Sequence, residues 1–568
     1  MSNAAILYSK SGYDGGVDQV KGRHVASASF LEAYCRYADT DRIYGALINK
    51  EDRLFFQNQV TSLLRESGRE RTVGGAALEF SNPFALQRVG ALYLADPALG
   101  KPAWRRMLPG RNAYSLIGVT HTMSGTKILD VMMDLVTGPV AYWDALICTS
   151  TSIRKMVTRT FDGMLDHYRR EWGGNPTMPI ELPVIPLGVD AGKFEALGDN
   201  QELRRSFREK LGIAEDDLVA LYFGRLTPHA KVHPVPMFVA ADRAAKELAK
   251  SGKKLHLVMT GQFPNEQIGK AVEEWAASVE AVTIHILNGA DREQSDGSWA
   301  IGDFFLSLSD NIQETFGITP IEAMAAGLPC VVSDWDGYKD TVEHGVTGIR
   351  VPTVIPPAGE GKDLTRAYAL GSMNYDLYVG AACMLTSVSV EKTAEAIVTL
   401  GKNAELRREM GGAARRRVRE LFDWSQIIPQ YQALYTELEN RRTSAQAESG
   451  AMSGFEIPNR PETFTMFSDH ATAHLQEQSR VRKVSDAALQ PTAIYQNRIC
   501  NFARSFHFNG EESEQLFSQI PDEPTRVETL LSAYAEDKHE NVLRTLVWFA
   551  KFGLIEIEAL ERGDENGE

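Results

Sequence analysis

Residues 303–333 read DFFLSLSDNIQETFGITPIEAMAAGLPCVVS, and this stretch decides the fold of the chain around it. Residues 303–308 are mostly apolar and precede polar residues, which predicts a buried strand that ends in a loop. Thr319 suits the N-cap of a helix and Glu322 suits its third position, so we expect a capping box there. Residues 330–333 then form a second apolar run. The stretch therefore predicts strand, loop, short helix and strand, which is a unit of a parallel α/β sheet.

The loop before this helix is the first candidate for a site. The backbone N–H groups of residues 316–318 lie at the expected helix N-terminus, where they are free to bind an anion. Glu314 and Glu322 lie close by, and two interpretations of this pair stay open from the residues alone. Glu322 either caps its helix while Glu314 is a solvated loop charge, or both carboxylates bind a ligand.

The wider stretch carries a family resemblance. Residues 314–334 (ETFGITPIEAMAAGLPCVVSD), followed by residues 343–352 (EHGVTGIRVP), closely resemble the nucleotide-sugar signature of retaining glycosyltransferase family 4. This family has the GT-B fold, and the resemblance extends over roughly residues 1–440. It implies two doubly wound Rossmann-like domains that face a central cleft.

The resemblance also implies roles for the residues of this loop and helix. It places Glu314 at the donor sugar and Glu322 at the ribose hydroxyls of the nucleotide. An ionised carboxylate accepts two hydroxyl hydrogen bonds at once, which suits both positions. Contacts with the donor sugar or its diphosphate are further implied for the backbone of Phe316, Gly317, Ile318 and Thr319.

Two cations follow an earlier strand. Arg225 and Lys231 resemble the pair with which the family neutralises the donor diphosphate, and a planar guanidinium with a compact ammonium suits phosphate oxygens. The common pattern has four residues between them, whereas LTPHA puts five between Arg225 and Lys231. His229 or His233 is therefore an alternative to Lys231. In isolation, such an Arg and Lys would be ordinary surface charges.

The first half of the chain adds a histidine and a glycine loop. His121 ends the apolar run LIGVT, at the edge where open sheets bind ligands. It matches the family histidine that faces the donor sugar and the acceptor. Gly15 and Gly16 follow the first expected strand and resemble the loop near the donor phosphates, although turns also favour glycine.

The pattern of apolar runs divides the chain into domains. Short apolar strands alternate with helical stretches twice, which predicts two parallel sheets covered on both faces. The first series has expected strands at 5–8, 43–48, 91–94, 114–119 and 145–148. The second has expected strands at 184–187, 218–223, 255–259, 282–287 and 303–308. We expect an N-terminal domain at 1–182, a nucleotide-sugar domain at 183–425, a closing helix at 426–442, a linker at 443–460 and a helical module at 461–568.

The last module lies outside the resemblance. Residues 541–552 have a helical apolar pattern, and residues 554–557 resemble a short strand, an arrangement similar to a winged helix. The segment is acidic, which argues against binding to nucleic acid. We expect it to bind a protein partner, the acceptor or a second copy of the chain.

Composition sets the outer bounds. The chain has 568 residues, is 43% hydrophobic and 24% charged, and carries a net charge of −15. No run is long and apolar enough to span a membrane, and the N-terminus lacks the features of a secretory signal. Five scattered cysteines without metal spacing favour free thiols in a reducing compartment, so a cytoplasmic location is expected. Basic clusters, which include Arg106 and residues 154–170, are either solvated helix faces or a surface for an anionic acceptor or a membrane.

These observations predict a retaining glycosyltransferase that transfers a sugar from a UDP- or GDP-type donor to an unidentified hydroxyl acceptor. Arg225 and Lys231 would stabilise the leaving diphosphate, so no metal ion and no other cofactor is expected. The main alternative is a catalytically idle GT-B domain that binds a nucleotide or glycan as a scaffold. A second alternative is a phosphorylase of the same fold with a lysine-bound pyridoxal phosphate.

Overall fold

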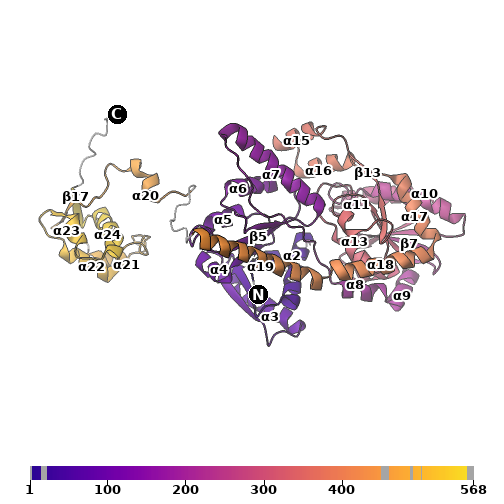
Figure 1. Cartoon of the computed structure of the whole chain (residues 1–568), viewed down its shortest axis with the longest axis horizontal. Coiled ribbons are helices and arrows are strands. Elements are labelled where there is room, and N and C mark those ends of the chain that lie inside the picture. Colours follow the sequence, from indigo (N-terminus) through magenta and orange to yellow (C-terminus); the bar gives the residue numbers. More distant parts are fainter. Residues whose placement is uncertain (1–2, 14–21, 450–459, 486–489, 501, 559–568) are drawn as a thin grey trace. The chain divides into compact units, whose positions relative to one another are not determined.

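The computed structural model describes residues 3–13, 22–449, 460–485, 490–500 and 502–558, and Figure 1 shows the chain. Contacts group the chain into two compact units, Met1–Phe455 and Glu456–Glu568. The first unit contains two parallel α/β sheets, and the second is a small α/β module. Each unit is described by itself.

The first sheet is entirely parallel and has the order β3-β2-β1-β4-β5-β6. Its strands are β1 Ala5–Tyr8, β2 Arg42–Leu47, β3 Gly74–Glu79, β4 Ala91–Leu94, β5 Ser115–Val119 and β6 Ala145–Ile147. The helices of this domain are α1 Lys10–Tyr13, α2 Gly22–Tyr37, α3 Arg53–Glu66, α4 Pro83–Val89, α5 Gly100–Arg106, α6 Thr126–Thr137 and α7 Thr151–Trp172. Strand order reverses between β1 and β4, which is the position where doubly wound sheets bind ligands.

The second sheet repeats the same order, as β12-β11-β10-β7-β8-β9, and is also parallel. Its strands are β7 Leu218–Phe223, β8 Leu255–Gly261, β9 Thr283–Asn288, β10 Phe304–Ser307, β11 Cys330–Ser333 and β12 Gly348–Val351. Its helices are α8 Ala191–Gly198, α9 Gln201–Leu211, α10 Pro234–Ala249, α11 Glu266–Ala277, α12 Arg292–Ile301, α13 Ile318–Ala325, α14 Tyr338–Thr341, α17 Val390–Lys402 and α18 Ala404–Leu421. The expected GT-B arrangement of two doubly wound domains is confirmed.

Two expectations about strands fail at particular residues. The strand expected at 184–187 is not a strand of the second sheet. Pro183 and Pro186 lack the backbone N–H groups that a strand donates to its neighbours in a sheet. The chain instead runs beside β6, where the Cys148 N–H donates to the carbonyl of Pro183. The expectations also missed β12, and they missed β3 because its sequence GGAALE lacks the β-branched and aromatic residues that mark a strand.

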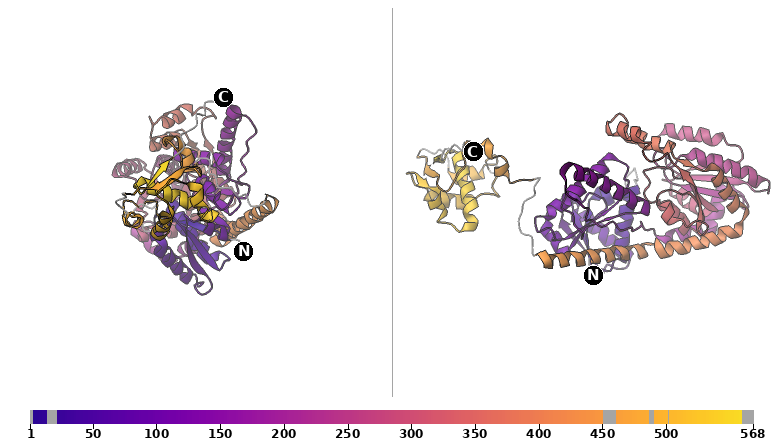
Figure 2. Two further views of the ribbon diagram at one scale, coloured as in Figure 1. Left: turned by 90° about the vertical axis from the view of Figure 1, so that its left-hand side faces the viewer. Right: turned by 45° about the horizontal axis from the view of Figure 1, so that its top comes forward.

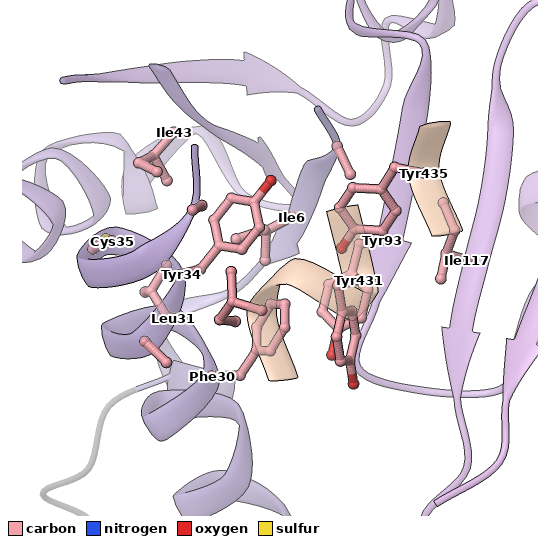
Figure 3. Packing of buried hydrophobic residues seen from close by; sticks show 14 of the residues in the cluster. Ile6, Phe30, Leu31, Tyr34, Cys35, Ile43, Tyr93, Ile117, Tyr431 and Tyr435 are labelled. Carbon is pink, nitrogen blue, oxygen red and sulfur yellow. The ribbon is translucent and has the colours of Figure 1, made fainter. Parts of the chain in front are cut away.

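A long helix, α19 Trp424–Ser449, joins the end of the second domain to the first. Figure 2 shows it in orange along the first domain. Trp424 Nε1 donates to Ser29 Oγ at 2.8 Å. Tyr431 and Tyr435 are buried against Phe30 and Tyr93, as Figure 3 shows. Residues 443–449, where a linker was expected to begin, are helical.

One helical hairpin interrupts the second domain. It consists of α15 Lys362–Ala369 and α16 Tyr375–Met384. The short antiparallel pair of β13 Thr353–Val354 and β14 Ser387–Val388 closes its base. No residue of α15 is buried.

The second unit has its own core. Its elements are α20 Thr463–Met466, β15 Arg480–Lys483, α21 Pro491–Gln496, α22 Gly510–Gln519, β16 Thr525–Arg526, α23 Val527–Leu531, α24 His539–Lys551 and β17 Ile555–Glu558. The strands form an antiparallel sheet of order β16-β15-β17. Leu516, Leu546 and Phe549 are fully buried between helices and sheet. The helix and strand expected at 541–552 and 554–557 are present as α24 and β17.

Candidate functional site

Three of the expected site residues follow neighbouring strands of the second sheet. Strands β7 and β10 lie side by side, with Ala220 opposite Phe304. The loop after β7 carries Arg225 and Lys231, and the loop after β10 carries Glu314. These loops leave the sheet where the strand order reverses, so the fold brings the three side chains to one ligand-binding edge.

Lys231 and Glu314 form an ion pair between the two loops. Their side chains are 20% and 10% exposed, respectively. Burial opposes ionisation of Glu314, but the Lys231 ammonium and the backbone amides of Thr315 and Phe316 outweigh it and lower the pKa of Glu314. Glu314 is therefore a charged acceptor at neutral pH, and Lys231 is the cation that keeps it so. The fifth residue in the loop does not prevent Lys231 from reaching the site.

The backbone of Arg225 is fixed by a hydrogen bond, whereas its side chain is exposed. The hydroxyl of the buried Tyr222 donates to the Arg225 carbonyl at 3.0 Å, which fixes the backbone. The guanidinium Nη2 makes one long hydrogen bond, 3.4 Å from the carbonyl oxygen of Ala230. Its remaining N–H groups are available to a ligand. A fixed backbone and an open guanidinium suit the binding of an anion.

The loop before α13 is fixed by Gly317. This residue is the N-cap of the helix and has φ +82°, in the left-handed region that favours glycine. A Cβ at this position would lie 2.0 Å from the ring of Tyr338, so the backbone and the ring occupy the space of a side chain. The tight turn directs the N–H groups at the start of α13 outward.

The expected capping box is wrong. The helix begins at Ile318, so Thr319 lies within its first turn and does not cap it. The Thr319 hydroxyl is buried and makes no hydrogen bond within the described residues. Gly317 takes the N-cap position instead of Thr319. Its left-handed backbone ends the loop, so the helix begins two residues earlier than the Thr-Pro pair predicts.

Glu322 therefore has no capping task. Its carboxyl group makes no hydrogen bond or ion pair within the part of the chain that the structure describes. Burial raises the pKa of Glu322 from 4.5 to about 7, against the opposing charges of Lys193 and Lys231. A half-protonated carboxyl beside a cationic loop is unusual for a helix surface and is typical of a binding site.

The first domain supplies His121 just beyond β5. Its Nε2 lies 3.1 Å from the carbonyl oxygen of Ala95. A cavity of about 10 Å³ adjoins it, lined in part by Phe30, Tyr93 and Trp424. The side chain is thus positioned at the carboxyl edge of the first sheet, as expected. Gly15 and Gly16, which were expected near the donor phosphates, lie outside the described residues.

The basic clusters of the first domain include one residue that is not on the surface. Arg106 is fully buried and forms an ion pair with the equally buried Asp144. It also donates to the carbonyls of Tyr114 and Pro139. Arg106 is therefore a structural residue and no part of a surface patch.

The two domains meet beside Glu314. Thr149 Oγ1 donates to the Thr315 carbonyl at 3.4 Å, and Ser150 Oγ donates to Asp336 Oδ1 at 3.2 Å. The Thr151 N–H, at the N-terminus of α7, donates to Asp340 Oδ2 at 2.6 Å. The N-terminus of a long helix from one domain thus binds carboxylates of the other.

Asp336 is a residue that the sequence expectations missed. It is the non-glycine residue with positive φ in the described chain, at +41°. Burial, supported by the charge of Glu314, raises the pKa of Asp336 to about 7. Its Oδ2 is buried without a hydrogen bond within the described residues. The signal in the sequence was an Asp-Gly pair directly after a strand, which suggests a turn but does not show what the carboxylate contacts.

No group of three or more His, Cys, Asp and Glu side chains among the described residues is placed to hold a metal ion. No described helix is both long and apolar enough to cross a membrane.

Comparisons with known proteins point to one family. Residues 204–357 match the family described as glycosyl transferases group 1. Curated relatives include a D-inositol 3-phosphate glycosyltransferase of Geodermatophilus obscurus, 28% identical over 46% of this chain and 55% of that protein. Another is an alpha-monoglucosyldiacylglycerol synthase of Acholeplasma laidlawii, 29% identical over 30% of this chain and 40% of that protein. The chain thus spans about half the length of these relatives.

Solved structures with a similar course of the chain include Anabaena Alr3699/HepE in complex with UDP. That likeness has a TM-score of 0.47 and 16% identity, and covers 77% of this chain and 100% of the other. The sucrose-phosphate synthase of Thermosynechococcus elongatus has a TM-score of 0.44 and 17% identity, over 78% of this chain and 100% of the other.

Proposed function

We propose, from the match of residues 204–357 to the group 1 glycosyl transferases, that this chain transfers a sugar from a nucleoside diphosphate donor to a hydroxyl acceptor, with retention of anomeric configuration. The observation that carries the proposal is the grouping of Arg225, the Lys231–Glu314 pair and the start of α13 at one edge of the second sheet. This edge offers two cations and free amides to a diphosphate, and carboxylates to the hydroxyls of a sugar and a ribose.

The donor would lie with its diphosphate at Arg225 and Lys231. Charge builds up on the outer phosphate as the bond to the sugar breaks, and fixed cations lower the energy of that state. Lys231 would then divide its N–H groups between the phosphate and Glu314. Glu314 would accept hydrogen bonds from the sugar. The amides of residues 317–319 would complete the pocket, whereas the Phe316 amide is already directed to Glu314. Arg225 and Lys231 would offset part of the diphosphate charge, so we expect no metal ion to be required.

The transfer itself exchanges two bonds on one face of the sugar. The bond from the anomeric carbon to the leaving phosphate oxygen breaks, and a bond to the acceptor oxygen forms on the same face. The acceptor hydroxyl gives its proton to the departing phosphate oxygen, so atoms and charge balance without another reactant. His121 lies at the facing edge of the first domain, where it would contact the donor sugar and the acceptor.

Glu322 would bind the ribose. Two ribose hydroxyls donating to one carboxylate favour its ionised form. In the absence of a ligand the pKa of Glu322 is about 7, so nucleotide binding should release part of a proton. This property distinguishes a ribose-binding carboxylate from a surface charge.

The acceptor and the setting of the reaction are further parts of the proposal. The printed names of the relatives differ in chemistry, since one names an inositol phosphate and the other names a glucosyl lipid as its product. No acceptor class is therefore transferred from them. Five free cysteines suit a reducing compartment such as the cytoplasm. The second unit exposes Phe464, Ile499 and Phe502, which supports a role in binding a protein partner, the acceptor or a second copy of the chain.

Mass spectrometry tests the proposal. The protein is incubated with a panel of UDP- and GDP-sugars and a lysate of its host, and the Arg225→Ala variant serves as the control. We expect loss of one donor, release of its nucleoside diphosphate and a new molecule heavier by one sugar residue. Donor binding without any consumption above the Arg225→Ala level would favour the idle scaffold.

A further inference from the structure

The helical hairpin of α15 and α16 lies outside the family match, which ends at residue 357. It projects from the base formed by β13 and β14, and it reaches the start of α6 in the first domain (Figure 1). The hairpin contributes little to the core of its own domain, since no residue of α15 is buried. Its polar contacts, in contrast, are directed to two loops of the candidate site.

The first contact is with the loop that follows His121. The Tyr375 hydroxyl and Ser124 Oγ are hydrogen-bonded at 2.8 Å. The Tyr368 hydroxyl accepts a hydrogen bond from the Thr126 N–H at 3.2 Å. Both bonds cross from the second domain to the first. The two tyrosines thus connect the hairpin to the wall that carries His121.

The second contact is with the loop that separates Arg225 from Lys231. Cys383 Sγ lies 3.5 Å from the carbonyl oxygen of Pro228. Asp376 Oδ1 lies 3.9 Å from His229 Nε2. A Cβ at Gly380 would lie 3.1 Å from His229 Cβ, so α16 lies directly against this loop. The hairpin therefore packs on the loop that holds both candidate phosphate-binding cations.

The tyrosines themselves are well supported. Tyr368 stacks on Tyr378, with ring centroids 4.5 Å apart and planes 12° from parallel. Burial raises the pKa of Tyr375, and the charge of Arg225 opposes that rise, so Tyr375 lies within electrostatic range of Arg225.

We propose that Tyr368 and Tyr375 are positioning residues that hold the hairpin across the acceptor side of the donor site, where it limits the size of the acceptor and excludes water from the donor sugar. This inference rests on the proposed function. Water is a competing acceptor in glycosyl transfer, so a barrier between the two domains at this place decides how much donor is lost to hydrolysis.

The test removes only the two hydroxyls. In Tyr368→Phe/Tyr375→Phe the rings and their stacking remain, while both bonds across the domain boundary are lost. The matched control is Tyr378→Phe, because Tyr378 lies in the same stack and its hydroxyl makes no hydrogen bond within the described residues. The first two measurements are UDP affinity and the rate of donor hydrolysis without acceptor. The third is the distance between spin labels at Asp130→Cys and Leu370→Cys. The labels are introduced into a Cys500→Ser chain, because the other four cysteines are buried.

We expect the double variant to hydrolyse the donor about tenfold faster. The loss of two hydrogen bonds should raise by about that factor the fraction of molecules in which the hairpin is detached from the first domain. UDP affinity should change less than about twofold, since the phosphate-binding groups are intact. The spin-label distribution should gain a longer component, and Tyr378→Phe should match the wild type throughout.

The outcomes separate the two proposals. A longer distance with unchanged hydrolysis would overturn the role in excluding water and leave a structural contact. An unchanged distance and unchanged hydrolysis would overturn the inference altogether. If no variant consumes any nucleotide sugar, the proposed function fails, whereas the distances still decide whether the tyrosines hold the hairpin to the first domain.

Discussion

Glu322 has a raised pKa, and its carboxyl group has no partner among the described residues, which makes its charge a reporter of ligand binding. The pKa rises from 4.5 to about 7, so the folded protein favours the neutral carboxyl. That preference contributes stability that is fully present below pH 4.5 and is lost as the pH rises through about 7. A ribose that donates two hydrogen bonds would reverse the preference.

The first prediction concerns pH. UDP affinity should be about tenfold weaker at pH 6 than at pH 8, because Glu322 must ionise to bind the ribose and its free pKa is about 7. Glu322→Gln should bind UDP more weakly at pH 8 and should lose most of this pH dependence. Calorimetric titrations in two buffers of different ionisation enthalpy measure affinity and proton release together. An equal pH profile in wild type and Glu322→Gln would show that Glu322 does not contact the nucleotide.

The second prediction concerns Arg225. Arg225→Ala should lower kcat by about 100-fold, since one charge-stabilising donor contributes roughly 3 kcal/mol to the transition state. The melting temperature should stay the same, because the guanidinium makes one long hydrogen bond of 3.4 Å in the described chain. Arg205→Ala, an exposed arginine of the same domain, is the matched control and should retain full activity. Equal rates in the two variants would remove Arg225 from the proposed mechanism.

At single residues, the sequence supports a prediction only where a residue belongs to a short motif. Glu314, Glu322 and Arg225 were expected at one site, and the structure places Glu314 beside Lys231 as that expectation requires. The contact of Ser150 with Asp336 was not predictable, because it joins residues 186 apart in sequence. Neither periodicity nor a local motif reports which loop of one domain faces which loop of the other.

At the level of elements, the turn before α13 controls the geometry of the site. Gly317 has φ +82°, and its Cα lies against the ring of Tyr338. The same ring hydroxyl is hydrogen-bonded to Ser307 Oγ at 3.0 Å at the end of β10. Strand, turn and helix are thus fixed by one buried tyrosine.

The third prediction follows from this packing. Gly317→Ala should lower the free energy of unfolding by more than about 3 kcal/mol, since it adds a steric clash to an unfavourable backbone conformation. Gly345→Ala is the control: this glycine has φ +81° and no atom within 4 Å of an added Cβ, so it should cost only roughly 1–2 kcal/mol. Urea denaturation of both variants measures the difference. Equal losses would mean that the Tyr338 contact does not restrict this turn.

Elements were predicted well where burial is continuous. The strands β1, β4, β7 and β11 begin and end at the expected residues, because short apolar runs between polar loops have few other structures open to them. Prediction failed at β3, where small residues carry no strand signal, and at the start of α13. There the left-handed glycine overrode the local preference for a Thr-Pro helix start.

For the whole molecule, α19 determines where the chain can be shortened. The helix is anchored on the first domain by Tyr431 and Tyr435 and continues to Ala445, which is buried against Ala141 and Trp143. The compact unit that contains both sheets ends at Phe455. The second unit has a separate core.

The fourth prediction compares two truncations. A chain that ends at Phe455 should keep the melting temperature of the first unit, UDP affinity and donor hydrolysis, while transfer to the natural acceptor is lost or altered. A chain that ends at Arg442 should melt at a lower temperature, because it loses the contact of Ala445 with Trp143. Differential scanning calorimetry and nucleotide release distinguish the two. If the longer truncation also loses donor hydrolysis, residues 456–568 belong to the catalytic unit and their proposed separate role is wrong.

We propose that the site at Arg225, Lys231 and Glu314 breaks the bond between a sugar and a nucleoside diphosphate on one face of the sugar. Proton NMR of the anomeric signals, recorded while the wild-type protein acts on UDP-α- and GDP-α-sugars in separate tubes, follows that bond directly. The account predicts that one donor signal decays and that the first sugar product has the α configuration, before mutarotation sets in. Donor signals that persist across the panel, or a first product with the β configuration, would contradict it.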